Sequence, residues 1–310
     1  MPRVSRDQGG AVTIPVGRHR LRLTNLDKVF WPQTGFTKGQ MIDYYTRVAE
    51  VLLPHLRDRP LTMKRYPDGV EGEMFFEKSC PGHRPSWVRT ARVWSESTGR
   101  HLEYCLVQDL ATLVWIAQLG TVELHVPLSR RRSASRPGAM VFDLDPGPPA
   151  TVVECCRVAL ELRRRLARLG LQALGKTSGS KGLQVYVPLN RPATYEDTKR
   201  VSRELAERLA AELPELVVHQ QRRDLRSGKV LVDWSQNDQD RTMVAVYSLR
   251  ARPRPTVSTP VGWEEVEECA RTGDPERLVF TADQVLERIA REGDRFRPVL
   301  ELRQRLPRPT

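Results

Sequence analysis

The segment Val141-Phe142-Asp143-Leu144-Asp145-Pro146 (141–146) decides the fold of the second half of the chain. Its apolar and acidic residues alternate, which indicates a β-strand with Asp143 and Asp145 on one face and the apolar side chains on the other. Pro146 ends this strand, so the two carboxylates lie near its rim. Two like charges this close repel each other unless a cation neutralises them.

A third carboxylate completes a candidate metal site. Asp233 ends a second apolar strand at 230–232, and hard oxygen ligands of this kind favour Mg²⁺ or Mn²⁺. Three carboxylates can hold two such ions roughly 3.5–4 Å apart, as in phosphoryl-transfer sites. We therefore predict that Asp143, Asp145 and Asp233 are catalytic metal ligands. Taken alone, an Asp-x-Asp pattern is more often a pair of turn-forming aspartates.

The loop Lys176-Thr-Ser-Gly-Ser-Lys-Gly182 (176–182) precedes a predicted strand and has the chemistry of a triphosphate site. Its glycines permit close backbone approach, while Ser178, Ser180 and Lys181 offer hydroxyls and a charge. Residues 170–177 match the Walker A pattern, but a helix precedes them and a strand follows, the reverse of a P-loop, so we reject that motif. A plain turn remains the alternative for the serine loop.

Helices and strands alternate along the second half, which indicates an α/β fold without revealing the strand order. Capping boxes predict helices that begin at Thr37, Thr151 and Thr281. Other helices are predicted from Asp109 to Leu119 and from Thr194 onward. Strands are predicted at 61–66, 73–77, 122–126, 140–144, 183–187, 230–234 and 242–248.

A basic loop at 129–138 is the predicted boundary between two modules. An N-terminal module is expected at about 21–128 and a catalytic module at about 139–300. Residues 1–20 are expected to form a loose basic leader, and residues 301–310 a tail.

The composition favours a polyanionic partner. The 310 residues include 50 Lys and Arg against 38 Asp and Glu, a net charge of +12 that suits nucleic acid, although a solvated basic surface would explain it too. Five cysteines, with Cys155 and Cys156 adjacent, form a poor disulfide framework. No apolar run approaches the ~20 residues of a membrane span. We expect a cytoplasmic, nucleoid-associated protein without a membrane partner.

Seven segments occur in a fixed order over roughly residues 20–300: LTNLDKVFWP…TKG (23–39), FFEK (75–78), LHVP (124–127), VFDLDPG (141–147), KTSGSKGLQVYVPL (176–189), VDWSQN (232–237) and YSLRARP (247–253). Together they resemble the polymerase domain of bacterial ligase D, the non-homologous end-joining polymerase of the archaeo-eukaryotic primase superfamily. Several motifs in order are far more specific than any one alone. The resemblance implies a primase-type α/β fold, with a catalytic mixed β-sheet flanked by helices and a smaller N-terminal α/β module.

The resemblance also implies template-directed DNA repair, in which NTPs or dNTPs are added to a DNA 3′-end at breaks or short gaps, often with ribonucleotides preferred. Two ions, Mn²⁺ or Mg²⁺, would assist in-line attack of the 3′-hydroxyl on the α-phosphorus. DNA with a downstream 5′-phosphate is the expected partner, with a DNA ligase and Ku as further candidates. A two-metal nuclease or phosphoesterase and a non-catalytic DNA-end-bridging module are the alternatives.

The matched motifs assign roles to individual residues by resemblance. The residues expected at the nucleotide are His125, Ser178, Ser180, Lys181 and Arg250. The residues expected at DNA are Asn25, Lys28 and Lys38 in a pocket for the downstream 5′-phosphate, Phe75 and Phe76 against the template base, and Arg226 and Lys229 nearby.

Several of these residues have simpler explanations. His125 could be a hydrogen-bonded histidine on a strand. Adjacent phenylalanines on a strand point to opposite faces, so a functional pair requires a loop or an exposed strand end.

The helix after Thr37 is expected to offer free backbone N–H groups to a phosphate. A zinc site could be written from Cys80, His83, His101 and Cys105, although such loose pairs arise easily.

Overall fold

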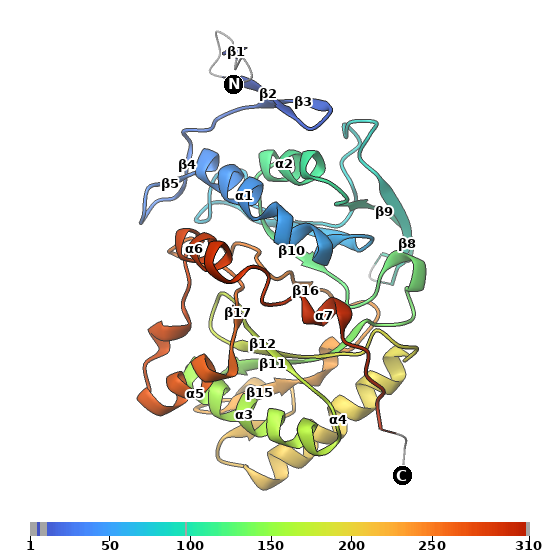
Figure 1. The fold of residues 1–310 in the computed structure, drawn as a ribbon, viewed down its shortest axis with the longest axis vertical. Coiled ribbons are helices and arrows are strands. Elements are labelled where there is room, and N and C mark those ends of the chain that lie inside the picture. Colours follow the sequence, from blue (N-terminus) through green and yellow to red (C-terminus); the bar gives the residue numbers. More distant parts are fainter. Residues whose placement is uncertain (1–4, 7–10, 97, 308–310) are drawn as a thin grey trace. The chain divides into compact units, whose positions relative to one another are not determined.

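The computed structural model describes residues 5–6, 11–96 and 98–307, which divide into two compact units (Figure 1). The first unit takes in Met1–Val126, Tyr247–Thr256 and Thr281–Gly293, and the second takes in Pro127–Val246, Val257–Phe280 and Asp294–Thr310. The first unit therefore includes two later segments that the sequence-based boundaries assign to the catalytic module. The Tyr44 and Tyr45 hydroxyls hold one of them through the backbone of Tyr247 and Leu249.

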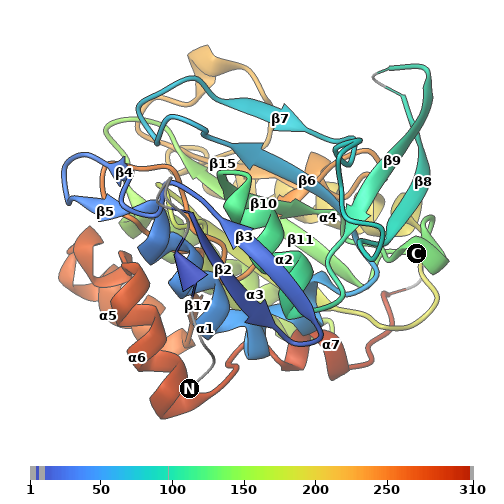
Figure 2. The same cartoon turned by 90° about the horizontal axis from the view of Figure 1, so that it is seen from above.

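An antiparallel sheet forms the centre of the first unit. Its order is β10 (Thr121–Val126), β6 (Pro60–Arg65), β9 (Arg100–Leu106) and β8 (Thr90–Ser95), with β7 (Phe75–Glu77) also paired to β6 (Figure 2). The helices are α1 (Lys38–Leu56), α2 (Leu110–Gln118) and α6 (Ala282–Glu292). Smaller sheets are formed by β1 (Ser5–Arg6), β2 (Val12–Val16) and β3 (His19–Leu23), and by β4 (Val29–Trp31) with β5 (Phe36–Thr37).

The segment predicted to be a loose leader contains paired strands. β2 and β3 form an antiparallel hairpin in which Val16, Leu21 and Leu23 are buried. Alternating apolar residues therefore order this part of the chain, although its basic composition suggested a loose segment. Residues 1–4 and 7–10 of the predicted leader lie outside the described residues.

The second unit is built on a mixed sheet. Its order is β14 (Val217–Val218), β15 (Val230–Asp233), β11 (Ala139–Pro146), β13 (Leu183–Pro188), β12 (Leu174–Thr177) and β17 (Pro260–Val261). β14 and β15 are parallel, and the other neighbours are antiparallel. The helices are α3 (Val152–Arg168), α4 (Tyr195–Glu212), α5 (Trp263–Thr272) and α7 (Pro298–Glu301). Short 3₁₀ turns lie at Arg131–Ser133, Arg223–Leu225, Trp234–Gln236 and Pro275–Leu278.

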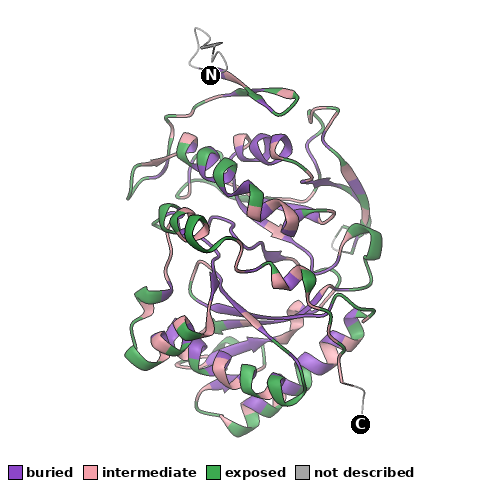
Figure 3. Ribbon diagram, viewed as in Figure 1, coloured by how far each residue is buried: buried purple, intermediate pink, exposed green. Residues whose placement is uncertain are grey.

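The core of the second unit lies between this sheet and its helices. Phe142 and Leu144, which alternate with the carboxylates along β11, are fully buried in a cluster with apolar residues of α3. Figure 3 shows buried segments along the strands of this sheet. Removing these side chains from water stabilises the unit, at roughly 25 cal/mol per Å² of apolar surface. The mixed α/β architecture is the one the sequence predicted. In the part of the chain that the structure describes, no helix is long and apolar enough to cross a membrane.

The local predictions succeed at helix starts and fail at some whole elements. The capping boxes at Thr37, Thr151 and Thr281 are present. The strand predicted at 242–248 is confined to β16 (Met243–Val244), and the chain passes from the second unit to the first after Val246. Helix α5 and strand β12 were not predicted.

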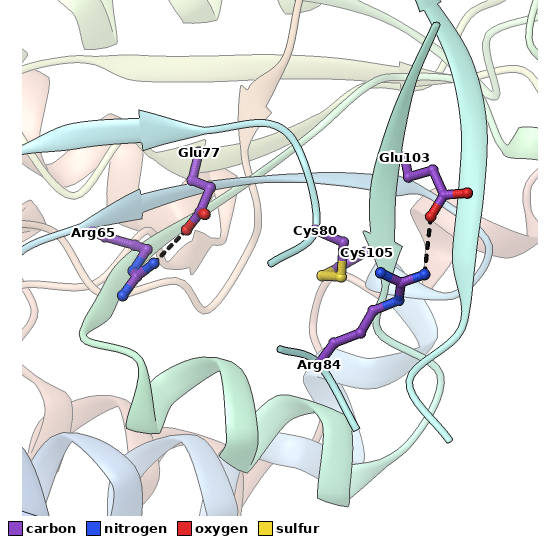
Figure 4. Close-up of a disulfide and its surroundings, with 6 residues drawn as sticks. All are labelled: Arg65, Glu77, Cys80, Arg84, Glu103 and Cys105. Carbon is purple, nitrogen blue, oxygen red and sulfur yellow. Dashed lines mark hydrogen bonds and ion pairs between the residues drawn. A yellow bond between two sulfur atoms is a disulfide. The ribbon is translucent and has the colours of Figure 1, made fainter. Parts of the chain in front are cut away.

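Cys80 and Cys105 form a disulfide that ties the segment after β7 to β9 (Figure 4). Both cysteines are buried, and their Cα atoms lie 4.9 Å apart. The expectation of a poor disulfide framework is therefore wrong for this pair, because antiparallel pairing brings distant segments together. The zinc alternative fails as well, since the two sulfurs bond each other. Cys155, Cys156 and Cys269 are free and buried.

We predict that breaking this disulfide lowers the free energy of unfolding by about 3 kcal/mol. The bond links residues 25 positions apart, and opening that loop restores conformational freedom to the unfolded chain. Guanidinium unfolding with and without a reductant would measure the loss, and Cys80→Ser should match the reduced wild type. Cys269→Ala removes a free cysteine and should keep the response to reductant. Five reactive thiols in the denatured, unreduced protein would contradict the pairing.

Candidate active site

The strands of the second unit place polar side chains in one row across the sheet. Asp143 on β11 lies opposite Asp233 on β15 and opposite Gln184 on β13. Gln184 in turn lies opposite Lys176 on β12. Residues directly opposite each other in an antiparallel pair share a face, so the row runs from a buried lysine to two carboxylates. Asp145 follows Asp143 by two residues and occupies the same face of β11.

Neutral donors bind the two carboxylates of this row. Gln184 donates a side-chain N–H to Asp143 Oδ1 at 2.9 Å. Asp233 Oδ1 accepts from the backbone N–H and the hydroxyl of Ser235 at 2.9 and 2.6 Å, and its Oδ2 accepts from the Gln236 amide at 2.9 Å. These donors stabilise the carboxylates without cancelling their charge.

Burial first, and then the neighbouring carboxylates, make Asp143 a weaker acid than usual, with a raised pKa. Burial, together with the charges of Asp145 and Asp233, raises the pKa of Asp143 to about 7. The hydrogen bond from Gln184 and the charge of Lys176 oppose this rise but do not overcome it. The row therefore holds more negative charge than its surroundings neutralise.

Oxygen donors with excess negative charge suit hard divalent ions such as Mg²⁺ or Mn²⁺. Among the described residues, however, no group of at least three His, Cys, Asp or Glu side chains is arranged so that it could hold a metal ion. Asp143, Asp145 and Asp233 would therefore have to turn toward a shared ion. Asp233 already accepts three hydrogen bonds, from Ser235 and Gln236, which leaves acceptor capacity on its Oδ2.

The loop after β12 folds tightly against the carboxylate end of β11. The Ser178 backbone N–H donates to the Gly182 carbonyl at 2.9 Å, and the Ser178 hydroxyl accepts from the N–H groups of Ser180 and Gly182 at 3.2 and 3.1 Å. A Cβ on Gly182 would lie 2.1 Å from the Leu144 carbonyl oxygen, so only glycine fits there. Lys181 is exposed in this loop.

A turn containing Arg226 and Lys229 packs against the residue that follows the carboxylate strand. A Cβ on Gly147 would lie 1.9 Å from the Arg226 carbonyl oxygen, and the Gly147 N–H donates to the Lys229 carbonyl at 2.8 Å. Both side chains are bound within the chain. Arg226 donates to Gln221, and Lys229 donates to the Pro214 carbonyl at 2.7 Å. A contact with DNA would require these bonds to open.

In the first unit, His125 and Arg250 meet at Glu123, a carboxylate that the sequence analysis overlooked. Glu123 Oε2 lies 2.9 Å from His125 Nε2 and 3.4 Å from Arg250 Nε. Glu123 Oε1 lies 3.4 Å from Lys64 Nζ, which was also overlooked. The two-residue spacing of Glu123 and His125 on a strand was the available clue, since it puts both on one face.

Charge and burial act in opposite directions in this cluster. Burial alone would raise the pKa of Glu123, but the hydrogen bond with His125 and the charges of Arg250 and Lys64 outweigh it and lower the pKa to about 2. Burial also lowers the pKa of His125, although Glu123 acts to raise it. The cluster therefore combines a carboxylate that stays ionised with a histidine that favours its neutral form.

Phe75 and Phe76 lie on the short strand β7, and both rings are exposed. The exposed strand that a functional pair requires is therefore present. The Phe76 ring lies 6.1 Å from the ring of His125 and 5.7 Å from Lys64 Nζ. The Arg65 Cζ atom lies 5.2 Å from the centroid of the Phe75 ring.

The backbone N–H groups at the start of α1 are already bonded within the chain, contrary to expectation. Those of Lys38 and Gly39 donate to the carbonyls of Lys28 and Leu26 at 2.8 Å. That of Gln40 donates to the N-cap hydroxyl at 3.2 Å. The turn that precedes the helix occupies these donors, so an anion at this place would have to bind side chains.

The turn brings three predicted DNA-contacting residues to the start of α1. Asn25 has a left-handed φ of 55° and begins the turn. Lys28 Nζ donates to Asp68 Oδ1 at 2.6 Å, and Lys38 Nζ donates to the Thr24 carbonyl at 3.0 Å. Burial and the charge of Lys28 lower the pKa of Lys38 to about 8. Two ammonium groups thus repel each other here, which an anion would relieve.

Carboxylates on neighbouring strands suit metal-assisted transfer of a phosphoryl group, and clustered cations suit the anionic substrates of such a reaction. The second unit supplies the carboxylates, on β11 and β15, and the first unit supplies the cations around Glu123. Fold and site together define a nucleotidyltransferase of the primase-polymerase class.

Comparisons with known proteins specify the family. Residues 37–296 match the family described as LigD, primase-polymerase domain. The multifunctional non-homologous end joining protein LigD of Mycolicibacterium smegmatis is 40% identical over 282 residues, which are 90% of this chain and 36% of that protein. The bifunctional non-homologous end joining protein LigD of Bacillus subtilis is 34% identical over 278 residues, which are 89% of this chain and 44% of that protein.

A solved structure gives the same assignment. The polymerase domain of Mycobacterium tuberculosis ligase D, in complex with DNA, superposes with a TM-score of 0.84 and 40% sequence identity, over 90% of this chain and 98% of that one. The chain belongs to the LigD primase-polymerase domain family. It spans less than half the length of the LigD proteins of M. smegmatis and B. subtilis.

We predict that Asp143→Asn stabilises the metal-free protein at neutral and higher pH. A carboxyl whose pKa is raised above its unfolded value stabilises the fold below that value, and this contribution is lost as the pH rises through about 7. The asparagine carries no charge, so its free energy of unfolding should exceed that of wild type by about 2 kcal/mol near pH 8, a value reduced for solvent screening of a partly exposed group.

Urea unfolding in the presence of a chelator would measure this difference, which should shrink as the pH falls toward about 4. Asp238→Asn is the matched control. Asp238 pairs with Lys199 at 2.5 Å and has a lowered pKa, so its replacement should give no gain. Equal stability of wild type and Asp143→Asn near pH 8 would contradict the repulsion.

Proposed function

We propose that this chain is a template-directed DNA-repair nucleotidyltransferase that adds NTPs or dNTPs to a DNA 3′-end at breaks or short gaps. The supporting observation is the register that sets Asp143 opposite Asp233, with Asp145 two residues along the same face. The active form holds two ions, Mn²⁺ or Mg²⁺, on these three carboxylates. Bound metal supplies Lewis acidity to the 3′-hydroxyl and to the departing pyrophosphate.

The remaining residues bind and orient the substrates. Lys181, on the loop beside β11, supplies a cation for the triphosphate, and Ser178 and Ser180 shape the loop that presents it. In the first unit, His125 and Arg250 offer a neutral imidazole and a guanidinium to phosphate groups of a nucleotide. Preorganised donors of this kind favour reaction because they need little rearrangement as charge develops.

The exposed aromatic pair and the cations serve DNA. Phe75 and Phe76 offer rings on which a template base can stack. Asn25, Lys28 and Lys38 bind the downstream 5′-phosphate through their side chains. Arg226 and Lys229 contact DNA once the hydrogen bonds that hold them to Gln221 and Pro214 have opened.

The relatives are named for non-homologous end joining, and the related polymerase domain was solved with DNA. We propose that this domain acts in the cytoplasm at the nucleoid, alongside a DNA ligase activity and with Ku at broken ends. The basic net charge of +12 supports association with DNA.

We predict that Asp143→Ala, Asp145→Ala and Asp233→Ala each abolish nucleotide addition while DNA binding survives, because the reaction needs all three carboxylates on metal and the DNA contacts lie elsewhere. Primer extension on gapped DNA, with each NTP and dNTP and with Mn²⁺ or Mg²⁺, would measure addition. We expect NTPs to be used at least as well as dNTPs. Asp238→Ala removes a surface carboxylate of the same unit and should stay active.

The same assay separates the rival functions. A nuclease or phosphoesterase would shorten the DNA without any nucleoside triphosphate, and a bridging module would bind ends without changing them. Full activity of Asp233→Ala would show that Asp233 is not a metal ligand. An inactive wild type that binds gapped DNA would overturn the proposed activity.

We predict that a 5′-phosphate on the downstream strand strengthens binding of gapped DNA, and that Lys28→Ala with Lys38→Ala removes this gain. Each charge-assisted contact should contribute roughly 1.5–3 kcal/mol if buried and less if exposed. Fluorescence titration of gapped DNA with and without the phosphate would measure the gain.

Asp68→Asn provides the opposite test. Asp68 holds the Lys28 ammonium at 2.6 Å and competes with any phosphate for it, so its neutralisation should increase the gain from the phosphate. Arg47→Ala, which removes an exposed cation elsewhere on α1, should leave the gain unchanged. An equal gain in wild type and in the double lysine variant would place the pocket elsewhere.

A further inference from the structure

Glu123 is the most enclosed charged side chain of the first unit's candidate site. Its side chain is 2% exposed, while those of His125, Arg250 and Lys64 are 14%, 17% and 18% exposed. A carboxylate therefore lies beneath groups that each keep part of their surface open. An incoming anion would meet the cationic layer and not the carboxylate.

The two oxygens of Glu123 join segments that are far apart in the sequence. Oε1 accepts from the Ala251 backbone N–H at 3.1 Å and lies 3.4 Å from Lys64 Nζ, on β6. Oε2 contacts His125, on β10, and Arg250. The segment that carries Arg250 is thus fixed to β10 through both a backbone bond and an ion pair to one carboxylate.

The backbone around Glu123 supports this placement. The register of β10 against β6 shifts between Thr121 and Glu123, and such bulges re-aim side chains next to functional sites. After the shift, Glu123 lies opposite Lys64. The Ser248 hydroxyl accepts from the Leu124 N–H at 2.9 Å, which binds the later segment to the same strand.

The charges of the cluster do not cancel. One carboxylate faces a lysine and an arginine, while His125 favours its neutral form, so a positive charge remains for an anion. The excess charge suits a polyphosphate.

We propose that Glu123 is a positioning residue that holds His125 and Arg250 in place for the triphosphate of the nucleotide, and that Lys64 is a further cation of this set. This inference rests on the proposed nucleotide-adding function. Glu123 itself does not touch the nucleotide. It sets the direction of the Arg250 guanidinium and the imidazole ring and keeps both from turning toward solvent.

Steady-state primer extension with Glu123→Gln tests the inference. The glutamine keeps the shape but not the charge, so we expect the KM for NTP to rise about tenfold with a smaller change in kcat, because the charge-assisted contacts to His125 and Arg250 are weakened. Glu123→Asp keeps the charge and should recover part of the loss. Glu103→Gln, which removes the partner of Arg84 in the same sheet, should leave the KM unchanged.

A double-variant comparison separates positioning from a merely structural role. In the Arg250→Ala background, Glu123→Gln should raise the KM much less than it does in wild type, because residues that act through one another are not additive. An unchanged KM in Glu123→Gln, or full additivity, would overturn the inference.

Binding of gapped DNA monitors the fold of the first unit in every variant. If Glu123→Gln also loses DNA binding, the KM for NTP of the Lys64→Met variant is measured instead. A KM equal to that of wild type in this variant would overturn the assignment of Lys64 and of the whole cluster to the triphosphate. If wild type adds no nucleotide at all, the proposed function fails. If wild type is active and the KM does not respond, this inference alone fails.

Discussion

The antiparallel register of β11 with β15 sets one carboxylate directly against another, and the second unit is organised around the resulting repulsion. Asp143 and Asp233 share a row of the sheet, so neither can move away without a change in strand pairing. The opposite face of β11 is buried in the core, which prevents such a change. Hydrophobic burial thus holds together charges that would otherwise separate, and the cost appears as the raised pKa of Asp143.

The same strand end also depends on two glycines. A side chain at Gly182 would collide with the Leu144 carbonyl, and one at Gly147 would collide with the Arg226 carbonyl. The serine loop and the Arg226 turn can therefore approach β11 only where no Cβ intervenes. Close backbone approach holds both loops against the end of β11.

Sequence patterns predicted what depends on local spacing. The alternation at 141–146 gave β11, and the capping boxes gave the starts of α1, α3 and α6. Helix α5 was not predicted, although Gly273 ends it in a left-handed conformation, because its N-cap residue, Gly262, has no side-chain oxygen that would mark the start of the helix. The spacing of Glu123 and His125 on β10 was a local clue, but the ion pairs of Glu123 with Arg250 and Lys64, and the bond of the buried Lys176 to Ser258, could not be predicted, since these partners lie on strands or segments distant in sequence. The bonded N–H groups of α1 were equally invisible, because the turn that binds them has no repeating pattern.

Each unit places a buried charge of one sign beside a larger number of charges of the opposite sign. In the second unit a buried cation, Lys176, lies in the row that leads to an excess of carboxylates, and in the first unit a buried carboxylate, Glu123, underlies an excess of cations. In both, the minority charge is enclosed, although Asp233 of the second unit's carboxylates is buried as well. A buried counter-charge lowers the repulsion among its neighbours and fixes their directions while leaving a net charge for a ligand of opposite sign. Each unit, taken by itself, therefore presents a surface of one sign, negative at the carboxylates of the second unit and positive at the cations of the first.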